Sequence, residues 1–208
     1  MEARLLYDGG MSSMVDMPSD PKKIRTRLRN YERKLAKEKE ELGVYRDGAG
    51  KRYFVAPLYM LLHDQEGALR SFAWYEQAFS DDIGESGHYL CWALALLRSG
   101  AEEGARAKLR CCMFANRYTL PKLLGLDPVT VGVHPDPDGL ALMYLEDIPD
   151  AYYELWNDDE KDWATNVFHN DAWARLRARF YEIETLLKDE PRGLRRSALV
   201  DELFQLQK

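Results

Sequence analysis

The sequence has few residues that could hold a metal ion or cross-link the chain. Its 208 residues include three cysteines and four histidines. Cys111 and Cys112 are adjacent, and neither a Cys-x-x-Cys nor a His-Glu-x-x-His spacing occurs. An odd number of cysteines argues against a disulfide framework, and the scattered histidines argue against a zinc site. We therefore expect no metal, no cofactor and a reducing cellular compartment.

The sequence also lacks the segments that direct a chain into or across a membrane. The longest apolar stretch, Tyr89 to Leu97, is about half of the ~20 residues that a transmembrane helix needs. The first twenty residues have no basic region followed by an apolar segment, so they do not resemble a secretory signal. These absences predict a cytoplasmic protein with no membrane partner.

Motifs of common enzyme classes are missing as well. There is no Gly-x-Ser-x-Gly elbow and no phosphate-binding glycine loop. The remaining candidates for chemistry are His88 and Cys91, which lie one helical turn apart, and the carboxylates between residues 136 and 162. Packing explains His88 and Cys91 better, and we expect the protein not to be an enzyme.

Charge is distributed unevenly along the chain, although the net charge is only -6. Residues 22–39 contain nine basic side chains, whereas residues 136–162 contain ten acids and a single base. A net acidic protein neutralises phosphates poorly, which argues against nucleic acid as a partner. The two stretches can attract one another or a partner protein.

The residues that are present predict a single helical domain. Hydrophobic residues make up 46% of the chain, which is enough for one core without cross-links. We expect residues 1–20 to form a flexible tail and residues 21–208 to form the domain. A helix over 21–43 should begin at a Ser19 or Asp20 cap followed by Pro21 and end at Gly43. Its narrow apolar stripe can dock on the rest of the domain or form a homodimer, and consists of Ile24, Leu28, Tyr31, Leu35 and Leu42.

The next segment matches itself at a spacing of 37 residues. Val55, Ala56, Tyr59, Ala68, Phe72 and Tyr75 correspond in order to Trp92, Ala93, Leu96, Ala105, Leu109 and Cys112. Large residues with a small one at a helix crossing are typical of helical hairpins. The pattern predicts two hairpins within residues 51–117, with helices over 52–62, 65–80, 87–99 and 101–115.

The spacing and residue types of these hairpins resemble the tetratricopeptide repeat, a helix-turn-helix unit that stacks into a superhelix. The resemblance implies a concave groove that holds a peptide or helix of a partner protein. Mapped onto this sequence, the groove positions are Tyr53, Pro57, Met60, Leu61, Leu90, Leu94, Leu97 and Arg98. This groove is apolar, so it can hold a partner or be filled by the chain's own C-terminal helices.

Residues 118–208 are expected to form a helical cap on the two hairpins. Asn116 to Gly125 is similar to a segment of bacterial repeat proteins in which a third, shortened hairpin follows. Residues 126–137 contain three prolines and alternating valines, which predict a loop or brief extended stretch. Short helices are then expected over 139–145, 149–156, 158–168, 171–188 and 191–206.

The sequence thus favours a non-catalytic interaction scaffold with a protein or peptide partner. Besides the groove, the acidic stretch 136–162 is a candidate contact surface. Two alternatives remain at this point. One is a small hydrolase or ligand-sensing domain with a pocket between hairpins and cap, built on His88, Cys91 and those carboxylates. The other is a homodimer formed through the stripe of the first helix.

Overall fold

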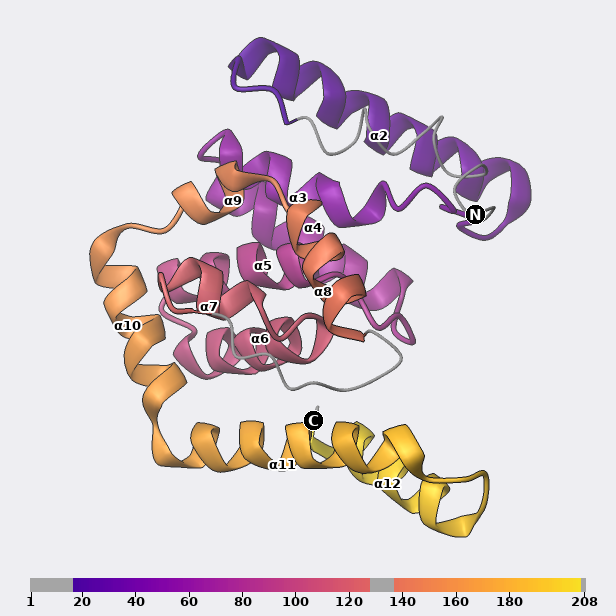
Figure 1. The fold of residues 1–208 in the computed structure, drawn as a ribbon. Coiled ribbons are helices and arrows are strands. Elements are labelled where there is room, and N and C mark those ends of the chain that lie inside the picture. Colours follow the sequence, from indigo (N-terminus) through magenta and orange to yellow (C-terminus); the bar gives the residue numbers. More distant parts are fainter. Residues whose placement is uncertain (1–16, 128–136, 207–208) are drawn as a thin grey trace.

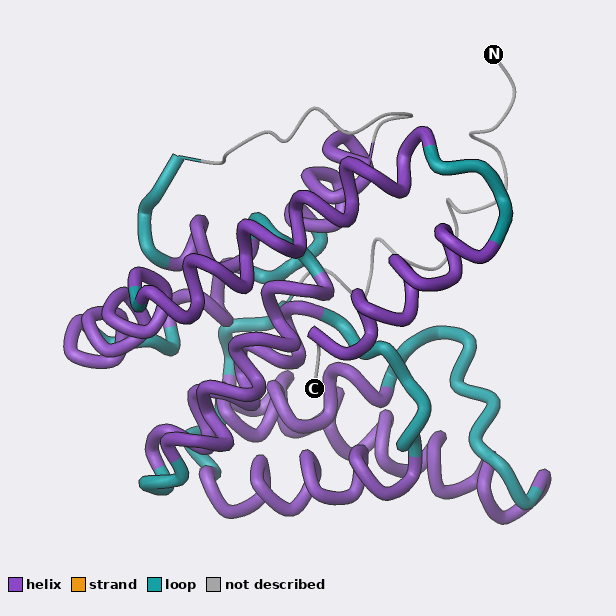
Figure 2. Tube along the Cα trace, turned by 90° about the horizontal axis from the view of Figure 1, so that it is seen from below, coloured by secondary structure: helices purple, strands orange, loops and turns teal. Residues whose placement is uncertain are grey.

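The computed structural model describes residues 17–127 and 137–206, and these form eleven helices and no strand (Figure 1). The predicted all-helical class is therefore confirmed for this part of the chain. Most of the predicted tail and the valine-rich part of the predicted loop lie outside the described residues. Short loops and turns join most successive helices (Figure 2).

Helix α2 (Pro21–Leu42) has the predicted bounds, and both of its ends are capped. The Asp20 side chain accepts a hydrogen bond from the Lys22 amide, and Gly43 adopts the left-handed conformation that ends the helix. The apolar stripe packs against α3 (Arg52–Leu61), mainly on Val55 and Leu58. The apolar stripe of α2 is therefore buried by contacts within the chain, and of its five residues only Leu42 at its end is substantially exposed.

Helices α3 and α4 (Gln65–Ala78) form the first hairpin, with a turn at the predicted His63 and Asp64. His63 has a φ of 57°, and the Asp64 side chain accepts a hydrogen bond from the Gly67 amide. Pro57 lies inside α3 without ending it. Because proline has no N–H, the carbonyl one turn earlier, at Tyr53, lacks its helical donor. The His88 ring takes that place at 3.0 Å through its Nδ1 atom.

Helices α5 (Ser86–Arg98) and α6 (Glu102–Ala115) form the second hairpin, and α5 is the centre of the core. Ten consecutive residues of α5, from Ser86 to Ala95, are buried. A helix that is buried on every side must have neighbours all round, and α5 contacts α3, α4, α6, α7 and α9. The stacked rings of Phe72 and Trp92, with centroids 5.0 Å apart, join the two hairpins.

The cap begins with a helix that the sequence did not predict, α7 (Thr119–Leu123). It is followed by α8 (Pro137–Glu146), α9 (Asp150–Glu154) and α10 (Asp158–His169). Figure 1 shows α9 beside α3, and α10 running along one side of the hairpins to the level of α11. A capping box begins α10, in which Asn157 and Glu160 each accept a hydrogen bond from the other's backbone amide.

The chain ends in an antiparallel pair, α11 (Asp171–Asp189) and α12 (Leu194–Leu206) (Figure 1). The last helix begins three residues later than predicted, after Pro191. Phe180 of α11 packs edge-on against Phe114, and the guanidinium of Arg117 pairs with Glu184 at 2.6 Å. These contacts attach the pair to the second hairpin.

Candidate functional site

The predicted groove residues do lie on neighbouring helices, but they do not form an open surface. Met60, Leu90 and Leu94 are at most 1% exposed, and Pro57 is also buried. Tyr53, Leu61 and Leu97 are partly buried, and Arg98 is exposed. A partner could therefore reach most of these side chains only if their cover moved.

The cover is the chain's own segment from Ile148 to Glu160. Ile148, Tyr152 and Trp156 belong to the same buried cluster as Leu90 and Leu94. Helix α9 contacts both α3 and α5, and a Cβ atom added at Gly87 would lie 3.1 Å from Ile148. Leu90 and Leu94 are thus buried together with residues of the chain's own C-terminal part.

Arg98 binds the C-terminal end of the segment 148–160. Its guanidinium pairs with the Glu160 carboxylate at 2.7 Å and donates to the Leu155 carbonyl at 2.6 Å. Both acceptors belong to the segment that covers the groove. The one charged groove residue is therefore engaged within the chain.

His88 and Cys91 are brought into the core rather than into a cleft. His88 is 2% exposed and Cys91 is fully buried. A carbonyl oxygen only accepts, so the Nδ1 atom of His88 carries the proton that binds the Tyr53 carbonyl. The Nε2 atom is buried without a hydrogen-bond partner. This arrangement requires a neutral ring.

The electrostatics agree with a structural role for both residues. Burial, together with the positive charges of Lys108 and Arg52, lowers the pKa of His88 from 6.5 to about 4. The Tyr53 carbonyl and Asp82 oppose that shift. Burial also raises the pKa of the Cys91 thiol, so it stays protonated and poorly nucleophilic. Neither of the two cavities described below is lined by these residues.

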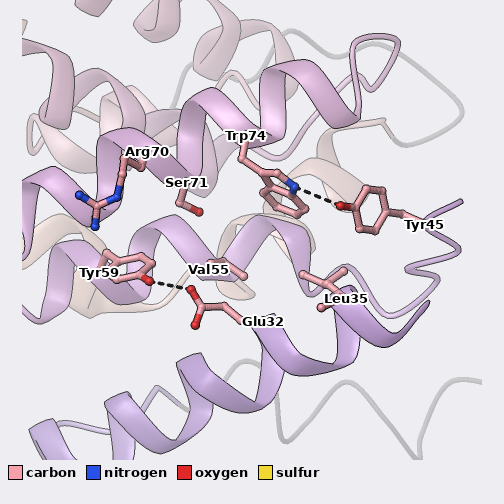
Figure 3. Close-up of a pocket in the computed structure, with 10 residues that line it drawn as sticks. Glu32, Leu35, Tyr45, Val55, Tyr59, Arg70, Ser71 and Trp74 are labelled. Atoms are coloured by element: carbon pink, nitrogen blue, oxygen red, sulfur yellow. Dashed lines mark hydrogen bonds between the residues drawn. The ribbon is translucent and has the colours of Figure 1, made fainter. Parts of the chain in front are cut away.

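A cavity of about 330 Å³ opens at a place that the sequence did not single out, between α2, α3 and α4 (Figure 3). We call it the α2–α4 pocket. Figure 3 shows side chains from all three helices turned toward one another, with Tyr45 from the preceding loop at one end. The lining residues are Glu32, Leu35, Ala36, Tyr45, Val55, Tyr59, Gly67, Arg70, Ser71 and Trp74.

The pocket combines an apolar interior with polar groups in fixed positions. Leu35 and Val55 are buried at 3% and 4% exposure. The Tyr59 hydroxyl donates to the Glu32 carboxylate at 2.6 Å, and the Trp74 indole N–H donates to the Tyr45 hydroxyl at 3.2 Å (Figure 3). Burial, then the Glu32 hydrogen bond and charge, raise the pKa of Tyr59 to about 12. The phenol is therefore a donor throughout the physiological pH range.

The pocket also has a feature that leaves it accessible. Ala36 lies on its lining yet is exposed, so the α2 side is not closed by a large side chain. Arg70 on α4 extends into solvent with its side chain 63% exposed, paired with Glu66. A few oriented polar groups around an apolar interior are typical of binding sites, and this volume suits one or two side chains.

A second cavity, of about 400 Å³, lies between the second hairpin and the last helix. Its lining includes Tyr89, Phe114 and Phe204, and its one carboxylate is that of Asp82. That carboxylate already accepts hydrogen bonds from Arg52 at 2.6 Å and from the Tyr53 hydroxyl at 2.8 Å. The lining of this cavity therefore has fewer polar side chains than that of the α2–α4 pocket.

Two other kinds of site are absent from the described residues. No three of their His, Cys, Asp or Glu side chains are grouped so as to hold a metal ion. No helix within residues 17–127 and 137–206 is both long and apolar enough to cross a membrane. The α2–α4 pocket is thus the candidate functional site.

Sequence reasoning missed this pocket because its residues come from three helices and a loop. One signal was available. Glu32 is the sole acid between residues 22 and 37 of the basic helix, and Ala36 is a small residue one turn later. A single acid among basic residues, with a small residue one turn away, indicates that this part of the helix surface is not simply solvated.

Comparisons of this chain with protein-family models, curated proteins and solved structures found no match.

Proposed function

We propose that this protein is a non-catalytic interaction module that binds a segment of a partner protein at the α2–α4 pocket. The observation that carries the proposal is an accessible cavity whose apolar interior is bordered by Glu32, Arg70 and Ser71. An apolar side chain of a partner would be buried against Leu35 and Val55. Burial of one large apolar side chain is worth about 1.5–3 kcal/mol.

The helical hairpins support the same class of function by analogy. The 37-residue self-match of the two hairpins resembles the tetratricopeptide repeat, whose members serve as interaction scaffolds. This likeness belongs to the proposal, since a fold alone does not determine function. The partner site proposed here differs from the concave groove of that family, because residues 148–160 cover the corresponding surface.

A cytoplasmic location is part of this proposal. Cys91, Cys111 and Cys112 are all free thiols, and Cys111 is partly accessible. Free cysteines persist in reducing compartments.

The proposal can be tested with a photo-crosslinking amino acid at the pocket. We would place p-benzoylphenylalanine at Ala36 and, as a matched control, at Ala178, an exposed alanine on α11. Both proteins would be expressed in the cells that make this protein, irradiated and examined by mass spectrometry. We expect a defined protein partner to be cross-linked from position 36 only.

Two results would contradict this function. One is the same set of products from both positions, which would indicate random encounters. The other is no product from position 36 while circular dichroism shows the protein to be folded.

A further inference from the structure

The solvent-facing side of α2 carries a continuous band of positive charge beside the pocket. Its members lie opposite the apolar stripe and span about 22 Å of helix at 1.5 Å per residue. All of them are exposed. We call this set the basic band, and it consists of Lys22, Lys23, Arg25, Arg29, Arg33, Lys34 and Lys37.

The basic band is almost unpaired within the part of the chain that the structure describes. Among residues 17–127 and 137–206, its one ion pair joins Lys37 to Glu41 at 3.5 Å, with both side chains more than half exposed. Arg33 donates to the Asn30 side chain, which leaves its charge uncompensated. Helix α10, which carries a cluster of acidic residues, lies apart from α2 in Figure 1. Seven like charges on one face favour an anionic partner.

Helix geometry places part of the band next to the pocket. Arg29 and Arg33 precede Glu32 and Ala36 by three residues, and residues at this spacing are neighbours on a helix surface. Glu32 and Ala36 both line the pocket. Arg70 lies on the opposite wall, on α4. Cations therefore border the pocket on two sides.

From this juxtaposition we propose that the partner segment is acidic: one of its apolar side chains enters the α2–α4 pocket while its carboxylates pair with the basic band. This inference rests on the proposed function and specifies the chemistry of the partner. It explains why a strongly basic helix surface is kept on a net acidic protein. Complementary charge mainly sets the rate and specificity of association, and the apolar anchor supplies affinity.

Nucleic acid fits this site less well than an acidic peptide. The aromatic rings at the pocket are occupied, because Trp74 packs edge-on against Tyr45 with centroids 5.5 Å apart and the Lys39 ammonium lies over the Tyr45 ring. Base stacking needs a free aromatic face.

A membrane surface and a second copy of the chain also fit less well. An interfacial helix inserts its apolar face into lipid, but the apolar face of α2 is buried against α3. In a second copy, the acids Asp158, Asp159 and Asp162 are exposed, but the neighbouring Trp156 is buried. The acidic start of α10 therefore lacks a free apolar anchor. Leu140 and Tyr144 of α8 are exposed, and binding of a second copy through them is one of the outcomes that the test distinguishes.

The test uses three fluorescein-labelled peptides and fluorescence anisotropy. The first is Asp-Glu-Glu-Leu-Trp-Glu-Glu-Asp. The second replaces Leu-Trp with Gly-Ser, and the third replaces every acid with its amide. We expect the first to bind the full-length protein at least about tenfold more tightly than either of the others, which corresponds to about 1.4 kcal/mol. Raising the salt concentration should weaken its binding, because exposed charges are screened.

Two variants separate the pocket from the charge. Arg29→Glu with Arg33→Glu should weaken binding of the first peptide about tenfold. Arg175→Glu with Arg192→Glu, which makes the same change in net charge on exposed residues of the C-terminal part, should not. Ala36→Trp should abolish binding by filling the mouth of the pocket. Circular dichroism would verify that each variant is folded.

The outcomes distinguish this inference from the proposed function. If the amide peptide binds as tightly as the acidic one, is blocked by Ala36→Trp and ignores the arginine reversal, the pocket binds partners but the acidic specificity is wrong. If no peptide binds at about 1 mM, the inference is overturned, while the cross-linking result decides the function separately. Preferential binding of a labelled oligothymidylate, of phosphatidylserine vesicles or of a second copy would also overturn it.

Discussion

The contact between Pro57, the Tyr53 carbonyl and His88 leads to a prediction that can be worked out in detail. Pro57 cannot donate to the Tyr53 carbonyl, and His88 donates instead from the second hairpin at 3.0 Å. Replacing His88 by Phe would retain a ring in the space between Phe72 and Tyr75, whose centroids lie 5.1 and 4.5 Å from it. The replacement would leave the partly buried Tyr53 carbonyl without a donor.

The loss of stability can be worked out from the carbonyl that is left without a hydrogen-bond donor. An unsatisfied buried carbonyl costs about 1–3 kcal/mol. In a Pro57→Ala background the new amide at position 57 can donate to the Tyr53 carbonyl, so the same loss of the histidine should cost less. We therefore expect a coupling free energy of about 1–2 kcal/mol between the two substitutions.

The assay is a double-mutant cycle of unfolding free energies, obtained by urea denaturation at pH 7.5, where the His88 ring is neutral. His169→Phe, at an exposed histidine on α10, serves as the control and should show no coupling to Pro57→Ala. The reasoning would be refuted if the cost of His88→Phe were the same in both backgrounds to within about 0.5 kcal/mol.

Three further predictions concern stability. The folded-state pKa of His88, about 4, is below the unfolded value of 6.5, so the unfolded chain binds the extra proton. The contribution of His88 to the free energy of unfolding is complete above pH 6.5 and decreases as the pH falls toward 4, by about 2 kcal/mol at pH 5. Urea unfolding of the wild type and of His88→Phe measures this contribution as the difference between their free energies of unfolding. A difference that does not change with pH would contradict the prediction. Asp47, whose side chain is buried, accepts hydrogen bonds from two backbone amides at the start of α3 and from two cations, so Asp47→Ala should cost about 2–4 kcal/mol in urea unfolding. Gly84 and Gly100 both have positive φ, but only at Gly84 would a Cβ atom meet the Tyr89 ring, at 2.5 Å. Gly84→Ala should therefore lower the melting temperature more than Gly100→Ala, which should cost only about 1–2 kcal/mol of backbone strain. Equal effects of the two substitutions would show that the Tyr89 ring moves aside without a cost in stability.

Helix positions were largely predictable because their signals are local. The Asp20 cap and the Gly43 terminus of α2 depend on neighbouring residues only, and both are present in the structure. The hairpin bounds agree to within two residues for the same reason, since the 37-residue self-match reports helical periodicity. Helix α7 was missed because five residues are too few to show a period.

The candidate site was much less predictable. The groove residues were placed correctly on neighbouring helices, but an apolar stripe indicates only that a surface is buried and leaves its neighbour undefined. Whether Leu94 faces a partner or Trp156 depends on where a segment more than fifty residues away folds back. The α2–α4 pocket could not be predicted for the same reason, because Glu32, Tyr59 and Trp74 come together only through tertiary packing.

The sequence by itself thus determined the all-helical class, the two hairpins and the separation of basic and acidic stretches, since capping, periodicity and charge are properties of adjacent residues. Tertiary structure alone decided that residues 148–160 cover the hairpins, that His88 replaces the donor lost at Pro57, and that a cavity lies beside the basic band. These features depend on contacts between distant segments, and hydrophobic burial, being non-directional, does not encode which segments meet.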